Sequence, residues 1–363
     1  MRILIISKEA WRDEQNGGNV LSNMFQGFDA EFAQIYCTAN EPNNRICKRY
    51  YQLTDKMMVN SILHRKNAGK KIDYQEYPIQ TETRRENYSG VKRFNSDTVR
   101  VIREILWKVA KWNDQELIEF AKEFEPDIIF APCYGNHYMI KLTKMMESVL
   151  HIPIISYISD DFYSNRQFKF SPVYWINHFI LRAHVREVFS LYTLVYTMTD
   201  EQKLQCEKVF HANMKVLRKS GNFDDTRIKE KCNDPIKLVY AGGIYLNRWK
   251  TLGVLVDTLK RINSGKVRMT LDIFTNTEID GNIGKKLNDG RNCRMHSAIS
   301  MDALKKVYAG SDIALHVEGF DLKNKSMVRL SFSTKIVDCL DSGCAVMAIC
   351  DSEQAGFCLS KKK

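Results

Sequence analysis

SFSTKIVDCLDSGCAVMAI, residues 331–349, decides the fold of the C-terminal half of this chain. It joins a polar loop to a short helix over 334–340 and an apolar run over 345–349. Ser333 is placed to cap the helix, and Gly343 can take the left-handed conformation that ends one. A continuous apolar run is typical of a strand covered on both faces of a parallel sheet. The stretch therefore predicts a loop–helix–strand unit of an α/β fold.

The helix start in this stretch also predicts an anion site. Unpaired amides at a helix N-terminus attract phosphate. Here they come with the hydroxyls of Ser333 and Thr334 and the ammonium of Lys335. Asp338 lies one turn later and can face the same ligand. An ordinary helix–strand unit with a solvated lysine is the alternative.

Composition narrows the class of protein. The 363 residues suffice for two domains, and 44% apolar residues with only 7 prolines indicate a folded chain. A net charge of +11 favours anionic ligands: phosphates, nucleic acid or an acidic membrane surface. The ten cysteines include no C-x-x-C pair, and the chain opens without a signal peptide's pattern. We therefore expect free thiols, no metal site and a cytoplasmic protein.

The N-terminal domain, predicted over 1–228, starts with a buried strand over 2–7 and a polar loop over 8–19. That loop holds Gly17 and Gly18 and leads into an amphipathic helix, as at the start of nucleotide-binding α/β domains. Further strands are expected at 31–36, 128–131, 153–158, 194–198 and 214–217, with a broken helix over 99–124.

Residues 43–98 carry several basic clusters and little periodicity. We interpret them as a basic insertion of short helices and loops. Its clusters predict a solvated face, with a surface for an acceptor or an anionic membrane as the alternative.

Side chains that follow the carboxyl ends of parallel strands are candidates for function. His137 follows the strand at 128–131, and Asp161 follows the strand at 153–158. Capping of a helix is the alternative for the histidine. The neighbouring Asp160 and Asp161 cannot chelate one ion, because adjacent side chains on an extended chain point to opposite faces. We expect one aspartate to cap a helix and the other to face a cleft.

The segment Tyr174–Tyr192 has an apolar stripe that charged residues interrupt. Its apolar stretches fall far short of the roughly 20 residues that a membrane-spanning helix needs. A core helix is the expectation, and a helix that lies on an anionic surface is the alternative.

The C-terminal domain, predicted over 229–363, begins after a polar linker at 229–235 and repeats the alternation of strands and helices. Strands are expected at 237–241, 268–274, 313–317 and 345–349, and helices at 252–262 and 301–309. A glycine-rich polar stretch is expected to run from the second strand to Asn292. Both domains are therefore predicted to be doubly wound, with parallel sheets.

Three stretches of the C-terminal half resemble one family: YAGGIYLNRWKTL (240–252), HVEGF (316–320) and the opening stretch. They are similar to the donor domain of GT-B glycosyltransferases, above all the glycosyltransferase family 4-like (group 1) proteins of bacterial surface-polysaccharide pathways. RILIIS…NGGNV and YTMTDEQKLQCEKVF…LRKSGNFDD resemble the acceptor domain of the same family. The resemblance implies two Rossmann-like domains that face a cleft, with a sugar nucleotide bound by the C-terminal one.

The resemblance also implies roles for single residues. Arg248 matches the basic group that holds the donor diphosphate, and Lys250 is a second candidate. Asp338 matches the second glutamate of the family's E-x7-E motif, which contacts the ribose. The remaining donor-site candidates match glycine turns and the loop-to-helix turn at the phosphates: Gly17, Gly18, Gly242, Gly243, Ser333, Thr334 and Lys335.

The chain departs from the family pattern at three places. Leu330 stands where the first glutamate of the motif is expected, and Glu318 is the carboxylate that could replace it. Gly243 stands where a basic residue is expected. The chain ends at Lys363, soon after the last predicted strand, so we expect an incomplete C-terminal domain.

The resemblance implies transfer of a sugar from a nucleotide-sugar donor to a polysaccharide or lipid-linked acceptor, with retention of configuration. Arg248 and Lys335 can balance the charge of the departing diphosphate without a metal or other cofactor. His137 or Asp161 would orient or deprotonate the acceptor hydroxyl. Contact with the inner face of an anionic membrane is left open.

Two other classes stay open. A non-catalytic partner protein with the GT-B fold is favoured by the missing glutamate and the short C-terminus. A nucleic-acid-binding protein is suggested only by the charge, since no zinc-finger, helix-turn-helix or RNP signature is present. We expect no nucleic-acid partner.

Overall fold

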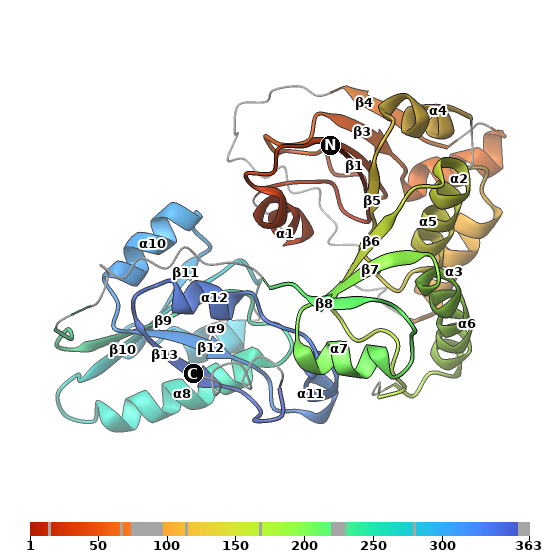
Figure 1. The fold of residues 1–363 in the computed structure, drawn as a ribbon. Coiled ribbons are helices and arrows are strands. Elements are labelled where there is room, and N and C mark those ends of the chain that lie inside the picture. The colour runs from red at the N-terminus through yellow and green to blue at the C-terminus, as the bar shows by residue number, and fades with distance from the viewer. Residues whose placement is uncertain are drawn as a thin grey trace. The chain divides into compact units, whose positions relative to one another are not determined.

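The computed structural model describes residues 1–13, 16–65, 68–73, 97–112, 115–166, 169–218, 229, 231–278 and 281–354. The chain divides into two compact units. The N-terminal unit comprises Met1–Asn165 and Lys169–Arg218, and the C-terminal unit comprises Arg166–Phe168 and Lys219–Lys363. Each unit is built around its own sheet (Figure 1).

The sheet of the N-terminal unit has eight strands in the order β4-β3-β2-β1-β5-β6-β7-β8. Neighbouring strands are parallel except β3 and β4. The strands are β1 (Arg2–Ser7), β2 (Glu31–Tyr36), β3 (Arg49–Gln52), β4 (Lys70–Asp73), β5 (Ile128–Phe130), β6 (Ile154–Ile158), β7 (Tyr192–Thr197) and β8 (Met214–Val216).

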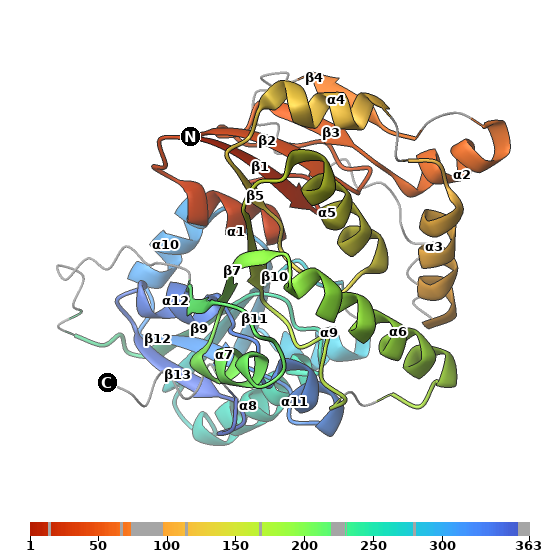
Figure 2. The ribbon, with the colours of Figure 1, turned by 45° about the vertical axis from the view of Figure 1, so that its right-hand side comes forward.

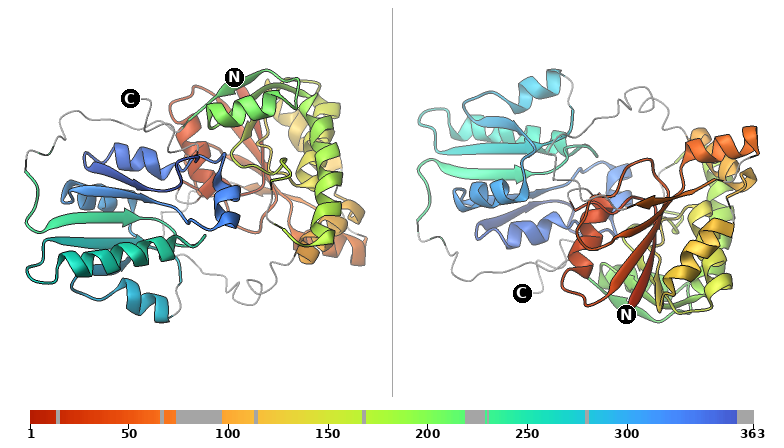
Figure 3. Two further views of the ribbon diagram at one scale, coloured as in Figure 1. Left: turned by 90° about the horizontal axis from the view of Figure 1, so that it is seen from below. Right: turned by 90° about the horizontal axis from the view of Figure 1, so that it is seen from above.

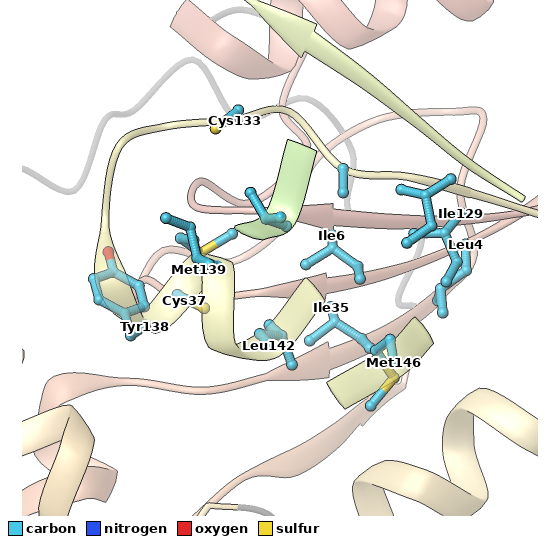
Figure 4. Close-up of a cluster of buried hydrophobic side chains, with 14 of the residues drawn as sticks. Leu4, Ile6, Ile35, Cys37, Ile129, Cys133, Tyr138, Met139, Leu142 and Met146 are labelled. Atoms are coloured by element: carbon cyan, nitrogen blue, oxygen red, sulfur yellow. The ribbon is translucent and has the colours of Figure 1, made fainter. Parts of the chain in front are cut away.

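Helices cover this sheet and build its core. They are α1 (Asn16–Phe25), α2 (Asp55–His64), α3 (Asp97–Val109), α4 (Gln115–Phe124), α5 (His137–Leu150), α6 (Pro172–Phe189) and α7 (Asp200–Glu207). The core joins apolar side chains of adjacent strands to the inner face of α5 (Figure 4). Ile6 and Ile129 come from the strands, and Met139, Leu142 and Met146 come from the helix. Residues three and four apart share a helix face, so α5 can bury this stripe.

Several local predictions for this unit are confirmed, and others need correction. The helix over 99–124 is broken, as predicted, into α3 and α4. Residues 43–65 and 68–73 form β3, α2 and β4, so this region extends the sheet as well as supplying a helix. Residues 74–96 lie outside the described part. The predicted loop over 8–19 ends earlier, because α1 begins at Asn16.

The C-terminal unit has five parallel strands in the order β11-β10-β9-β12-β13. They are β9 (Ile236–Ala241), β10 (Met269–Thr275), β11 (Cys293–Ser297), β12 (Ile313–Val317) and β13 (Ala345–Ile349). The helices are α8 (Arg248–Ile262), α9 (Gly281–Leu287), α10 (Met301–Ala309), α11 (Leu322–Val328) and α12 (Lys335–Leu340).

Helices lie on both faces of this sheet (Figure 3). Leu252, Val256 and Leu259 of α8 pack in one core cluster with β9 and β10. Tyr308 of α10 and Cys339 of α12 belong to a second cluster. This arrangement confirms the predicted doubly wound α/β architecture.

The prediction for the last strand was wrong in one respect. β13 pairs with β12 as expected, but it is the edge strand of the sheet within the described residues. Its side chains are largely exposed, with Val346 at 39% and Met347 at 43%. An apolar run shows only that the residues are hydrophobic. It does not show whether the strand lies in the centre or at the edge of the sheet. The stretch before Asn292, predicted to be a polar connection, contains the helix α9. The strand β11 that follows it was not predicted either.

Asp312 ties the start of β9 to the start of β12. Its carboxylate accepts hydrogen bonds from the backbone N–H of Lys237 (2.7 Å) and of Asn233 (3.0 Å), and from Lys229 Nζ (3.0 Å). Burial alone would raise the pKa of Asp312, but these hydrogen bonds outweigh it and hold the pKa well below its usual range. The carboxylate therefore stabilises the fold while it is ionised.

We predict that Asp312→Ala lowers the free energy of unfolding by about 2–4 kcal/mol, because buried backbone donors lose their acceptor. Urea unfolding of the wild type and the variant measures the difference. The pKa of Asp312 falls on folding, so this contribution is present above pH about 4 and is lost as the pH falls further. A difference that stays constant down to pH 2 would contradict the role of the ionised carboxylate.

Candidate functional site

The strand order of the C-terminal unit points to one crevice. The order reverses at β9, with β10 on one side and β12 on the other. The loops that follow the two neighbouring strands at such a reversal, here β9 and β12, leave in opposite directions. Ligands of doubly wound sheets bind between these loops. The loops concerned are residues 242–247 after β9 and residues 318–321 after β12.

The loop after β9 is in close contact with the side chain of Lys335. Gly242 has a φ of +149°, and a Cβ there would lie 2.1 Å from Lys335 Nζ. A Cβ on Gly243 would lie 2.2 Å from the ring of Tyr245. The hydroxyl of Tyr240 donates a hydrogen bond to the carbonyl of Gly243 (2.8 Å). The positive φ of Gly242 favours glycine, and side chains pack directly on the backbone at both positions.

A buried ion pair joins the two loops. Arg248 Nε lies 2.8 Å from Glu318 Oε2, and Arg248 Nη2 lies 2.8 Å from Glu318 Oε1. Both residues are buried, at 7% and 3% exposure. The guanidinium also lies over the ring of Tyr245, at 5.2 Å from its centroid. Bidentate geometry fixes the direction of both side chains.

Further contacts lock the same loops together. Thr251 Oγ1 donates to the carbonyl of Glu318 (2.8 Å), and Asn247 Nδ2 donates to Asp321 Oδ2 (2.8 Å). A Cβ on Gly319 would lie 2.2 Å from the carbonyl oxygen of Leu246. The backbones of the two loops therefore touch, and side-chain hydrogen bonds join them.

Lys335 supplies a charge that nothing in the described part of the chain neutralises directly. Its Nζ is buried, has no hydrogen-bond partner among those residues and lies 5.6 Å over the ring of Tyr240. Burial, followed by the nearby charge of Arg248, lowers the pKa of Lys335 to about 8. Buried polar groups are almost always paired. An unpaired buried ammonium is therefore expected to meet an anionic ligand.

His316, the first residue of the HVEGF stretch, completes the cluster, and no sequence pattern pointed to a role for it. Its Nε2 lies 3.8 Å from Glu318 Oε1. Burial lowers the pKa of His316 to about 4, and the charges of Arg248 and Lys335 act in the same direction. The imidazole is therefore neutral at pH 7. Glu318 engages Arg248 directly, whereas Lys335 Nζ has no hydrogen-bonded partner among the described residues.

The other predicted donor-site residues divide into two groups. Ser333 and Thr334 are half-buried directly before Lys335, and the helix cap is Thr334 instead of Ser333. Asp338 is half-buried one turn into α12, close enough to influence the pKa of Lys335. Lys250 instead lines a cavity of about 450 Å³ between α8 and the loop after β12, and Lys335 does not line it.

The remaining predicted residues belong to the N-terminal unit. Gly17 and Gly18 lie in the first turn of α1. His137 is the first residue of α5, and its Nδ1 lies 2.8 Å from Nδ1 of His184. Burial lowers the pKa of His137. The roles predicted for these residues stay predictions.

Asp161 closes a turn after β6. Its carboxylate accepts hydrogen bonds from the backbone N–H (3.0 Å) and the hydroxyl (2.6 Å) of Ser164. The helix that follows is capped by Ser171, so the expectation that one of the two aspartates caps a helix was wrong. Among the described residues, no group of three His, Cys, Asp or Glu side chains is arranged to hold a metal ion.

We predict that Lys335→Met raises the free energy of unfolding at pH 7 by about 1–3 kcal/mol, because the wild type then carries an unpaired buried charge. The pKa of Lys335 falls on folding from 10.5 to about 8. The destabilisation by charged Lys335 is therefore complete below pH 8. It disappears as the pH rises toward the pKa that Lys335 has in the unfolded chain. Thermal or urea unfolding at pH 7 and pH 10 measures it. A variant that is less stable than the wild type at pH 7 would refute the assignment.

We predict that Glu318→Ala lowers the free energy of unfolding by about 3–5 kcal/mol, because it leaves the Arg248 guanidinium buried and unpaired. Urea unfolding measures the loss. The double variant Arg248→Met/Glu318→Leu serves as the control, since it removes both charges together. It should recover much of the stability, and a double variant no more stable than Glu318→Ala would argue against the pair as the cause.

Comparisons with known proteins bear on the fold. No family model matches the chain, and no curated protein resembles it in sequence. The solved structure of a lipopolysaccharide outer core galactosyltransferase, WaaB, has a TM-score of 0.52 at 11% identity, over 96% of this chain and 80% of that one.

Two sugar-phosphate synthases are similar to the same degree. An α,α-trehalose-phosphate synthase (UDP-forming) from Burkholderia xenovorans has a TM-score of 0.53 at 10% identity, over 99% of this chain and 92% of that one. Sucrose-phosphate synthase from Thermosynechococcus elongatus has a TM-score of 0.53 at 9% identity, over 96% of this chain and 80% of that one. With its two Rossmann-like parallel-sheet units, the chain has the GT-B fold of these glycosyltransferases.

Proposed function

We propose that the C-terminal unit binds the diphosphate of a nucleotide-sugar, and that the protein transfers the sugar to a glycan or lipid-linked acceptor. The observation that carries this proposal is the ammonium of Lys335, buried at the switch point without a partner among the described residues. Phosphate oxygens are the natural ligands of such a group. The fold supports the proposal, since the similar solved structures include a galactosyltransferase and a UDP-forming synthase.

The chemistry divides between the two cations. Sugar transfer releases a nucleoside diphosphate, whose developing negative charge needs fixed positive groups. Lys335 would contact the phosphate directly. Arg248 would act through its charge, because Glu318 already holds two of its nitrogens. Glu318 is then a positioning residue for Arg248. We propose a metal-independent, retaining transfer on this basis and on the family resemblance.

The other residues receive roles within the same proposal. The backbone amides of Gly242 and Gly243 and the hydroxyls of Ser333 and Thr334 would bind phosphate oxygens, and Asp338 would bind the ribose. Lys250 is the weaker candidate for the diphosphate, since it lines another cavity. Gly17, Gly18, His137 and Asp161 would serve the acceptor side. The proposed setting is the cytoplasm, in a bacterial surface-polysaccharide pathway.

A second candidate function is a non-catalytic partner with the same fold. One observation favours it: Leu330, at the position of the family's first glutamate, is buried and apolar. Glu318 cannot replace that carboxylate freely, because Arg248 engages both of its oxygens. A partner of this kind would bind a nucleotide-sugar without releasing a nucleoside diphosphate.

We predict that one class among UDP-, GDP-, CMP- and dTDP-sugars raises the unfolding temperature of the full chain. Saturation at 100 times the dissociation constant corresponds to about 2.7 kcal/mol of stabilisation. Lys335→Met should abolish the shift. Lys266→Met is the matched control, because Lys266 is an exposed lysine of the same unit that pairs with Asp234. No shift with any sugar nucleotide, or an unchanged shift in Lys335→Met, would refute the donor site.

Release of nucleoside diphosphate from the sugar nucleotide that gives the shift separates the two candidates. A transferase releases it, and Arg248→Ala should slow the release by about 100-fold, as expected for a lost electrostatic contact. Binding without release would support the non-catalytic partner.

A further inference from the structure

Two neighbouring helices of the N-terminal unit expose an apolar stripe in addition to their buried ones. Figure 2 shows α3 beside α5 and α6, and the three helices pack against one another. We call the exposed stripes the α3–α6 face: Val99, Ile102, Ile105 and Val109 of α3, and Val173, Ile176, Phe179 and Ile180 of α6. Steps of three and four residues place each set on one side of its helix. Exposed apolar stripes on neighbouring helices are candidates for a contact site.

A cavity of about 480 Å³ lies between α3, α5 and α6. Its walls are largely apolar and include Trp107 of α3 and Ile140 of α5. Ile105 and Ile180 line the cavity as well, and they are also 55% and 50% exposed on the α3–α6 face. The cavity therefore opens at this face. Its volume is within the range of about 300–1,000 Å³ that small-molecule sites have.

Lysines outnumber carboxylates in the lining of the cavity. Lys108 and Lys141 line it, and no carboxylate in the described part of the chain pairs with either ammonium. Lys141 Nζ lies 4.7 Å over the ring of Trp112, and the charge of Lys108 adds to burial in lowering the pKa of Lys141. Two cations thus stand beside an apolar opening without a described counter-ion.

The two acidic residues of the cavity wall are already engaged. Glu187 pairs with Lys144 at 2.7 Å. Glu104 accepts hydrogen bonds from the backbone N–H of Tyr138 and from Asn136 Nδ2, both at 3.3 Å. Glu187 therefore has a paired cation, whereas Glu104 is held by neutral donors. A ligand for this cavity needs an apolar chain and an anionic group at its end.

We propose that this cavity takes an acyl chain of an anionic phospholipid while the α3–α6 face rests on a membrane surface. The apolar stripes match the acyl region, and Lys108 and Lys141 match the phosphates of the headgroups. A second copy of the chain fits less well, because a two-fold interface would bring the lysine rim close to itself. Within the described residues no helix is both long and apolar enough to cross a bilayer.

Vesicle flotation of the full chain tests the proposal. Vesicles of phosphatidylcholine alone are compared with vesicles that also contain phosphatidylglycerol. The chain should float with the anionic vesicles and not with the neutral ones, and high salt should weaken the binding, since salt screens exposed charges. Lys108→Glu/Lys141→Glu should weaken it by about tenfold or more. Val254→Ser, an exposed apolar position of α8, is the control and should bind like the wild type.

The cavity itself is tested by Ile180→Trp, which fills its opening but keeps the face apolar. If a lipid acyl chain enters the cavity, this variant should bind vesicles more weakly. If the apolar surface only adheres to the membrane, the variant should bind equally well or more strongly. Ile105→Trp is the second variant if the first one misfolds by circular dichroism. Equal binding of the folded tryptophan variants, or equal binding of the wild type to neutral vesicles, would overturn the proposal.

A further outcome assigns the cavity elsewhere. If polyprenyl phosphate in detergent binds and Ile180→Trp abolishes this, while anionic vesicles do not bind, the occupant is a lipid-linked molecule and the phospholipid assignment is wrong. The inference does not rest on sugar transfer. A chain that floats with vesicles but shows no shift with sugar nucleotides would refute only the donor site.

Discussion

The buried pair of Arg248 and Glu318 is the interaction on which the C-terminal unit depends. It joins residues 70 positions apart, at the two loops that flank the switch point of the sheet. Two charges taken out of water are tolerable only when their geometry satisfies both. The bidentate contact does this, and the close approach of Gly319 to Leu246 leaves no room for a side chain between the loops.

With Arg248 engaged by Glu318, the free positive charge of the crevice belongs to Lys335. Gly242 provides the surface on which its side chain lies, and His316 stays neutral beside it. Such an arrangement opposes stability, because an unpaired ammonium is held in a buried site. Perturbed groups of this kind concentrate at functional sites. A cation without an ion-pair partner among the described residues occurs again beside the cavity of the α3–α6 face, at Lys108 and Lys141.

Amphipathic patterns in the N-terminal unit predicted α3 and α6 correctly as helices but did not show which apolar residues would be covered. Each helix carries more apolar residues than its packing buries, as Ile102 and Ile176 illustrate. A hydrophobic period reports that one side of a helix avoids water; the neighbouring helices decide how much of that side they cover. The cavity between α3, α5 and α6 arises from that mismatch, so no sequence pattern could have located it.

The sequence by itself determined most of the local elements and the doubly wound class. α10 and β12 have the predicted bounds, and the start of α12 brings Ser333, Thr334 and Lys335 together as the pattern indicated. Tertiary structure decided the pairing of Arg248 with Glu318, the edge position of β13 and the added strands β3 and β4. The physical reason is the distance along the chain over which each interaction acts. Periodicity and capping act over one or two turns, whereas ion pairs, strand order and burial depend on which distant segments meet.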